Sequence, residues 1–130
     1  MSQPAIDITA CQATESSPAS ILMVAREEAA APDVIRHLRA QGVSVDRIDS
    51  GETALGMLAK KRYALAMIDS DVDGEKGLGL LETMRRHSAD LPVVITTAVA
   101  SVKHAVTAMQ KGAADYLMKP VSTEAIETYV

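Results

Sequence analysis

Three aspartates at alternate positions form the stretch "DSDVDG", which runs from Asp69 to Gly74. Carboxylates at this spacing suit calcium coordination, phosphate-ester hydrolysis by two aspartates, or acceptance of a phosphoryl group on one carboxylate. A calcium loop would follow a helix and would carry a bidentate Glu at its twelfth position. Here an apolar strand precedes the aspartates, and Leu80 occupies that twelfth position. We therefore exclude the helix–loop–helix calcium site.

A phosphatase would use Asp69 as nucleophile and Asp71 as general acid, and "MIDSDVD" fits that pattern weakly. Such enzymes need a larger chain, with a cap region and further motifs, than these 130 residues. The chemistry at Asp69 therefore depends on which other side chains the surrounding elements bring to it.

Short apolar segments alternate with amphipathic ones from Ile21 onwards. Apolar runs predict strands at 21–25, 43–48, 63–69, 92–98 and 115–120. Helical spacing of apolar residues predicts helices at about 29–41, 51–61, 78–84 and 101–112, and from 122 to the chain end. Several strands are apolar on both faces, which is typical of a parallel sheet covered by helices on both sides. The sequence predicts a doubly wound α/β domain.

The helix predicted over 101–112 has Ser101 as its N-cap. Its apolar residues fall on one face: Val102, Ala105, Val106 and Met109. The three histidines lie on predicted helices without a partner motif, so we expect them to face solvent and not to bind a metal: His37, His87 and His104.

Composition bounds the class of protein. The chain has a net charge of −4 and no basic cluster longer than "KKR" at 60–62, which argues against a nucleic-acid surface. The single Cys11 cannot form an internal disulfide and indicates a reduced compartment. Residues 1–20 read as a flexible tail rather than a signal peptide, and no apolar stretch is long enough to span a membrane. We expect a soluble cytoplasmic domain at 21–130, with a truncated last helix and an output domain beyond the chain end.

Three polar side chains stand where predicted strands end. Asp69 ends the third strand, Thr97 the fourth and Lys119 the fifth. Ligands of open parallel sheets bind at the carboxyl ends of the strands. A carboxylate there can attack a phosphoryl group while a hydroxyl and an ammonium hold the phosphate oxygens.

These residues occur in longer motifs. Gly77 follows Asp69 by eight residues, Thr97 lies in "PVVITTA", and Tyr116 and Lys119 lie in "AMQKGAADYLMKPV". From Ile21 to about Tyr129 the chain resembles the receiver domain of bacterial two-component response regulators, most of all the nitrogen-regulator type.

The resemblance implies a flavodoxin-like (CheY-like) fold with five parallel strands in the order 2-1-3-4-5, and a cis peptide bond between Lys119 and Pro120. It implies that Asp69 is the phosphoacceptor, that Thr97 and Lys119 bind the phosphate, and that Thr97 and Tyr116 form a switch pair. The switch would report to the face of the fourth helix, fifth strand and fifth helix.

The resemblance also implies the partners and the activity. The partners would be a sensor histidine kinase, a C-terminal output domain that regulates transcription, and a second copy bound through the switch face. No membrane contact and no direct nucleic-acid contact is expected of this domain. The domain would not be an enzyme beyond self-phosphorylation and autodephosphorylation at Asp69 within the phosphorelay.

The sequence departs from the family where Mg²⁺ binds. The family has two adjacent acidic residues after its first strand, and Ala25 and Arg26 replace them here. Mg²⁺ prefers oxygen ligands that include one or two carboxylates. We therefore expect weak or absent Mg²⁺ binding, with Asp69 and Asp71 as weak ligands. Asp71 either compensates in part or belongs to a solvated loop, as we expect for Asp73.

Arg26 has two readings. Its guanidinium either takes the place of the cation beside Asp69, through charge-assisted hydrogen bonds, or extends into solvent. Three function classes remain: a phosphorylatable receiver, a pseudo-receiver that binds partners without phosphate or Mg²⁺, and a flavin-mononucleotide binder. The last would need a phosphate loop rich in Ser, Thr and Gly after the first strand, and "AREEAAAP" is not one. Retained Asp69, Thr97 and Lys119 favour an atypical receiver.

Overall fold

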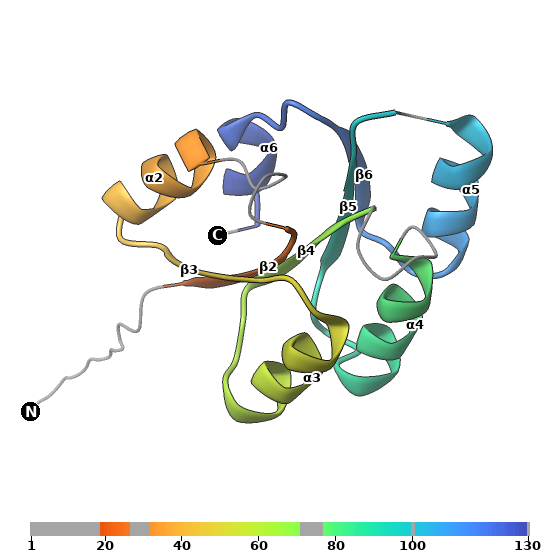
Figure 1. Ribbon diagram of the computed structural model, residues 1–130, viewed down its shortest axis with the longest axis horizontal. Coiled ribbons are helices and arrows are strands. Elements are labelled where there is room, and N and C mark those ends of the chain that lie inside the picture. The colour runs from red at the N-terminus through yellow and green to blue at the C-terminus, as the bar shows by residue number, and fades with distance from the viewer. Residues whose placement is uncertain (1–18, 27–31, 71–76, 100, 130) are drawn as a thin grey trace, which may run out of the picture.

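A computed structural model of the chain describes residues 19–26, 32–70, 77–99 and 101–129 (Figure 1). The strands are β2 (Ser20–Val24), β3 (Ser44–Ile48), β4 (Leu65–Asp69), β5 (Val93–Thr97) and β6 (Asp115–Met118). The helices are α2 (Pro32–Ala40), α3 (Gly51–Lys60), α4 (Leu78–His87), α5 (Val102–Gln110) and α6 (Thr123–Glu127). Every predicted element is present, with ends that differ by a few residues. Residues 1–18 of the predicted tail lie outside the described residues.

The strands form one parallel sheet in the order β3-β2-β4-β5-β6, which confirms the predicted order 2-1-3-4-5. All residues of the three inner strands β2, β4 and β5 are buried, whereas the edge strands β3 and β6 are partly exposed. This explains the continuous apolar runs of the inner strands, since helices cover both faces. Because all five strands are parallel, their carboxyl ends meet at one edge of the sheet.

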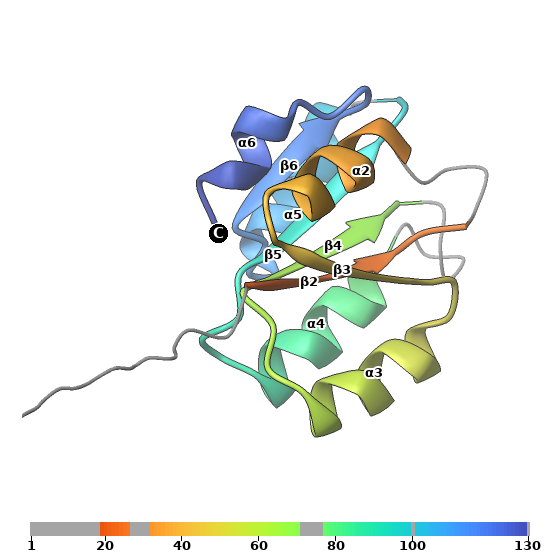
Figure 2. The same cartoon turned by 90° about the vertical axis from the view of Figure 1, so that its left-hand side faces the viewer.

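Two apolar cores lie on opposite faces of the sheet. Helices α2 and α6 cover one face, where Leu38 and Ile126 pack against Met23 and Met67. Helices α3, α4 and α5 cover the other, and Ala54, Leu81 and Ala108 lie in its core. Figure 2 shows the two-sided arrangement, with α2 and α6 above the sheet and α3 and α4 below it. The core is aliphatic, as the lack of Trp and Phe requires.

Helix α5 begins as predicted, because the Ser101 hydroxyl accepts a hydrogen bond from the His104 backbone N–H at 3.3 Å. Its buried residues are His104 and Ala108. The apolar face found in the sequence is instead the exposed one, since Val102 is 83% exposed and Val106 and Met109 about half exposed, at 49% and 48%. The spacing placed these residues on one face, but that face has no neighbouring element within the described part of the chain.

Candidate functional site

The site is built around Asp69, the last residue of β4. The strand lies between β2 and β5 and is covered on both faces, so the Asp69 residue is only 3% exposed. Its position in the sheet is opposite Thr96 of β5, and the Ser70 backbone N–H that follows it donates to the Thr96 carbonyl at 2.8 Å. A carboxylate in this setting is held at a defined place at the carboxyl edge of the sheet.

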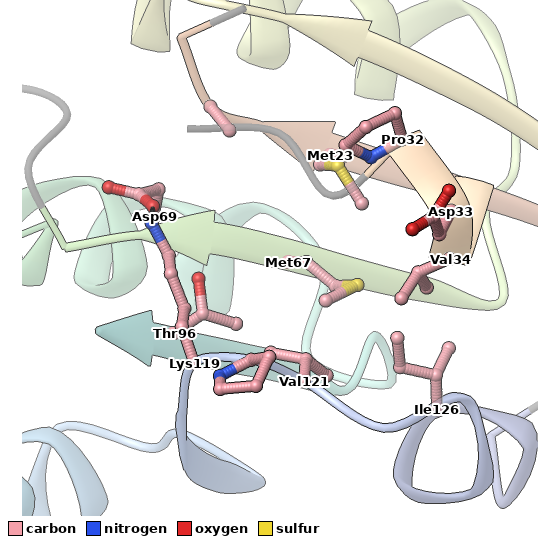
Figure 3. Close-up of a pocket in the computed structure, with 12 residues that line it drawn as sticks. Met23, Pro32, Asp33, Val34, Met67, Asp69, Thr96, Lys119, Val121 and Ile126 are labelled. Carbon is pink, nitrogen blue, oxygen red and sulfur yellow. Dashed lines mark ion pairs between the residues drawn. The ribbon is translucent and has the colours of Figure 1, made fainter. Parts of the chain in front are cut away.

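Lys119 is the cation that pairs with this carboxylate. Its ammonium forms an ion pair with Asp69, and its side chain is 24% exposed (Figure 3). The Lys119 backbone N–H donates to the Thr97 carbonyl at 2.8 Å, which anchors the residue just beyond the end of β6. The Lys119–Pro120 peptide bond is cis, which confirms the prediction.

The two threonines at the end of β5 have different surroundings. Thr97 is buried, and its hydroxyl donates to the Val99 carbonyl at 3.1 Å and accepts from the Val99 N–H at 3.2 Å. Thr96, one residue earlier and on the opposite face, lines a cavity together with Asp69 and Lys119 (Figure 3). The sequence reasoning did not select Thr96, although strand alternation in "TT" places one hydroxyl on each face.

Tyr116 of β6 is half-buried and packs against the core under α3, α4 and α5. Its hydroxyl lies 2.8 Å from Nδ1 of His104, and the two rings meet edge to face, with centroids 5.1 Å apart. The prediction that His104 faces solvent is wrong, because this residue is 7% exposed. The other two histidines, His37 and His87, are exposed as predicted.

The positions of the missing acidic pair differ from each other in burial. Ala25 is 4% exposed, and its carbonyl accepts a hydrogen bond from Nη1 of Arg47 at 2.9 Å. Arg26 is exposed, which favours the reading in which its guanidinium extends into solvent. Lys119, rather than Arg26, is the cation that the structure shows in an ion pair with Asp69. Arg47 on β3 was not selected from the sequence, where nothing relates it to Ala25.

The side chains after the first strand offer few ligand atoms to a divalent cation such as Mg²⁺. Ala25 has no ligand atom in its side chain and Arg26 is itself a cation. Among the described residues no three His, Cys, Asp or Glu side chains gather where they could hold a metal ion. Asp71, predicted as a weak ligand, lies outside the described residues, as do Asp73 and Glu27. The described residues therefore do not fit a Mg²⁺ centre with two carboxylates after the first strand.

A cavity of about 540 Å³ opens beside the ion pair, between the sheet and helices α2 and α6. Figure 3 shows apolar side chains around most of it, among them Met23, Met67 and Ile126. Asp69 and Lys119 stand at one end. The cavity thus leads to the ion pair of Asp69 and Lys119 between mostly apolar side chains.

The fold and the site thus combine a doubly wound parallel sheet with a buried carboxylate at its carboxyl edge and a lysine held against that carboxylate. The family model described as "Response regulator receiver domain" matches residues 21–130. The chain belongs to this family, whose members are signalling proteins of two-component systems.

Two curated relatives from Pseudomonas aeruginosa are transcription regulators or response regulators by name. The response regulator protein FleR is 36% identical over 108 residues, which cover 83% of this chain and 23% of FleR. The alginate biosynthesis transcriptional regulatory protein AlgB is 34% identical over 113 residues, which cover 87% of this chain and 25% of AlgB. The chain thus spans about a quarter of the length of these two relatives.

Solved structures agree with the fold. A response regulator from Burkholderia pseudomallei, described with a phosphorylated aspartic acid, a calcium ion and citrate, matches with a TM-score of 0.76 and 25% identity. The match covers 85% of this chain and 65% of that one. The beryllofluoride-activated NtrC4 receiver domain dimer matches with a TM-score of 0.75 and 25% identity over 84% of this chain and 90% of that one. No helix in the described part of the chain is long and apolar enough to cross a membrane.

Proposed function

We propose that this receiver domain accepts a phosphoryl group on Asp69 from a sensor histidine kinase, slowly and with little help from Mg²⁺. The observation that carries the proposal is the buried Asp69 carboxylate held against the Lys119 ammonium at the edge of the sheet. A carboxylate oxygen would attack phosphorus, the bond from phosphorus to the kinase imidazole nitrogen would break, and that nitrogen would keep the electron pair. The phosphorylated aspartic acid of the Burkholderia pseudomallei relative supports this role.

The slow rate follows from the charges at the site. In phosphoryl transfer a metal ion neutralises charge that develops on the phosphate oxygens. Here Lys119 supplies one positive charge, and Ala25 and Arg26 supply no carboxylate to hold a metal. The Lys119 ammonium would also have to give up its contact with the nucleophilic oxygen or share it with the phosphate.

The signal would leave through Thr97 and Tyr116 towards α5, β6 and α6, the fourth helix, fifth strand and fifth helix of the domain. Apolar side chains are exposed here: Val99, Val102, Val106, Met109 and Met118. We propose that this face binds a second copy of the domain and so switches a C-terminal output domain that regulates transcription. The NtrC4 receiver dimer and the names of FleR and AlgB support that proposal. The cytoplasmic location of the domain stays a prediction, which rests on the single cysteine.

A pseudo-receiver that works without phosphate is the second candidate. The loss of both acidic residues at Ala25 and Arg26 favours it. It would use the same exposed face for binding, and Asp69 and Lys119 would serve only to stabilise the fold.

Treatment with acetyl phosphate, followed by separation on a Phos-tag gel, distinguishes the two candidates. We expect a slowly forming shifted band that depends little on Mg²⁺ and is absent in Asp69→Asn but present in the control Asp90→Asn. The double variant Ala25→Asp with Arg26→Asp should form the band about tenfold faster or more, and only with Mg²⁺. No band in the wild type, with a normal band in the double variant, would establish the pseudo-receiver instead.

A further inference from the structure

His104 is a buried polar residue that no step of the proposed phosphoryl transfer uses. It is the third residue of α5, and its backbone N–H is held by the Ser101 hydroxyl. Its Nδ1 lies 2.8 Å from the Tyr116 hydroxyl. Its Nε2 is buried without a hydrogen-bond partner within the described residues. The imidazole therefore makes a single polar side-chain contact in that part of the chain, and this contact is with Tyr116.

The contact joins two elements that carry the exposed apolar face. His104 belongs to α5 and Tyr116 to β6, where it is paired in register with Ile95 of β5. Val102 and Val106 of α5 point to solvent on the other side of the same helix. Any rotation of the Tyr116 ring away from α5 would leave a second ring nitrogen of His104 buried and unpaired, which is unfavourable.

Thr97 is engaged elsewhere. Its hydroxyl makes both of its hydrogen bonds with the backbone of Val99, in the segment that leads to the N-cap Ser101 of α5. A phosphoryl group that drew the Thr97 hydroxyl towards Asp69 would release the Val99 backbone. The change would thus reach the start of α5, where His104 is anchored through its backbone.

We propose that His104 is the positioning residue for Tyr116 in this chain, so that the tyrosine follows helix α5 rather than moving independently of it. The inference rests on the proposed function, because it describes how the switch face of that function is set. Without phosphate, the hydrogen bond and the edge-to-face contact hold Tyr116 in the half-buried position. On phosphorylation, Thr97 acts on α5 through Val99, and His104 carries Tyr116 with the helix.

The test uses nuclear magnetic resonance of the full chain with ¹³C-labelled tyrosine. The chain has three tyrosines, so Tyr116→Phe assigns the Tyr116 signals by their loss. In the absence of phosphate, His104→Leu should shift the Tyr116 ring ¹³C signals, most of all that of Cζ, because the Tyr116 hydroxyl loses its contact with Nδ1. His87→Leu is the matched control, because His87 is an exposed helix residue, and it should leave the ring unchanged.

Two conservative variants separate positioning from packing. In His104→Asn the side-chain amide stands at the place of Nδ1. This variant should reverse at least half of the change in the Tyr116 signals that His104→Leu causes. The amide of His104→Gln stands at the place of Nε2 and should restore little. If His104 only fills space, Leu should preserve the Tyr116 signals better than Asn does, and that result would overturn the proposal. An unchanged ring in His104→Leu would overturn it as well.

A second measurement does not depend on any His104 variant folding. In Tyr116→Phe, the ¹⁵N signal of His104 Nδ1 should shift while that of His87 stays in place, and an unmoved Nδ1 signal would contradict the contact.

A third measurement follows the response to phosphorylation. With acetyl phosphate, the Tyr116 and α5 signals should shift together in the wild type but separately in His104→Leu. If Asp69 accepts no phosphate, neither set shifts, and the result without phosphate still decides the role of His104.

Discussion

Asp69 and Lys119 form an ion pair across an intervening strand, since Asp69 ends β4, Lys119 follows β6, and β5 lies between them. The backbone of Lys119 is anchored to Thr97 at the end of that middle strand, which brings the ammonium over the strand to the carboxylate. The charge on Asp69 is therefore compensated by a residue about fifty positions away in the chain. Under the proposed function, stability and phosphoryl acceptance are linked at this pair.

Removing the lysine should destabilise the domain. Lys119→Met leaves the Asp69 carboxylate buried without this partner, and we expect the free energy of unfolding in urea to fall by about 2–3 kcal/mol. Lys103→Met, which removes an exposed lysine on α5, should change it by less than about 0.5 kcal/mol. Adding Asp69→Asn to Lys119→Met should recover at least half of the loss, because no buried charge remains. A Lys119→Met variant as stable as the wild type would show that the pair contributes nothing.

Gly77, at the start of α4, should not tolerate a side chain. Its φ of +74° lies in the left-handed region, and a Cβ there would approach Cγ2 of Ile68 to 2.7 Å. We expect Gly77→Ala to lower the melting temperature, with a loss of stability of about 2 kcal/mol from backbone strain and overpacking. Gly56→Ala within α3 meets no atom within 4 Å and should raise stability by about 0.5–1 kcal/mol. Equal effects of the two substitutions would contradict the steric argument.

Asp46 of β3 should make the stability pH-dependent. The hydrogen bond from the Tyr63 hydroxyl at 2.7 Å lowers the pKa of the Asp46 carboxyl, burial opposes this, and Lys61 at 3.0 Å lowers it further. A lowered pKa in the folded state stabilises the fold above the unfolded value of about 4. That contribution is lost as the pH falls through the folded value.

We therefore expect Asp46→Asn to cost about 1 kcal/mol of unfolding free energy at pH 7, and this cost should shrink progressively as the pH falls below about 4. Urea unfolding of both proteins across this range measures the difference. Asp33→Asn, which affects an ion pair whose two side chains are 75% and 91% exposed, should show little effect at any pH in this range. A penalty for Asp46→Asn that does not change with pH would contradict the assignment.

The exposed face of α5 should matter for association and not for folding. Val106→Glu places a charge on a side chain that is 49% exposed, so we expect the free energy of unfolding to change by less than about 0.5 kcal/mol. After acetyl phosphate treatment, sedimentation should show self-association weakened by about tenfold or more if this face binds a second copy. Ala59→Glu, at an exposed position of α3, is the control and should associate like the wild type. Unaltered association of Val106→Glu would place the contact elsewhere.

The architecture follows from the residue pattern alone. Continuous apolar runs require strands that are buried on both faces, and only a parallel sheet between two helical layers provides this. Such a sheet brings all carboxyl strand ends to one edge, so the places of Asp69, Thr97 and Lys119 in the chain predict that they lie near one another there. The absence of carboxylates at Ala25 and Arg26 was equally visible, because it depends on residue type alone.

The packing of the elements, and not the local residue pattern, sets which faces of these residues are buried and which partners they have. Helical periodicity groups Val102, Val106 and Met109 on one side of α5, but it does not tell whether that side meets the sheet or the solvent. Burial is set by the neighbouring elements, and β6 meets the side that carries His104 and Ala108. The pairing of His104 with Tyr116 depends likewise on the position of α5 over β6, which pairwise contacts in space determine and local sequence spacing does not.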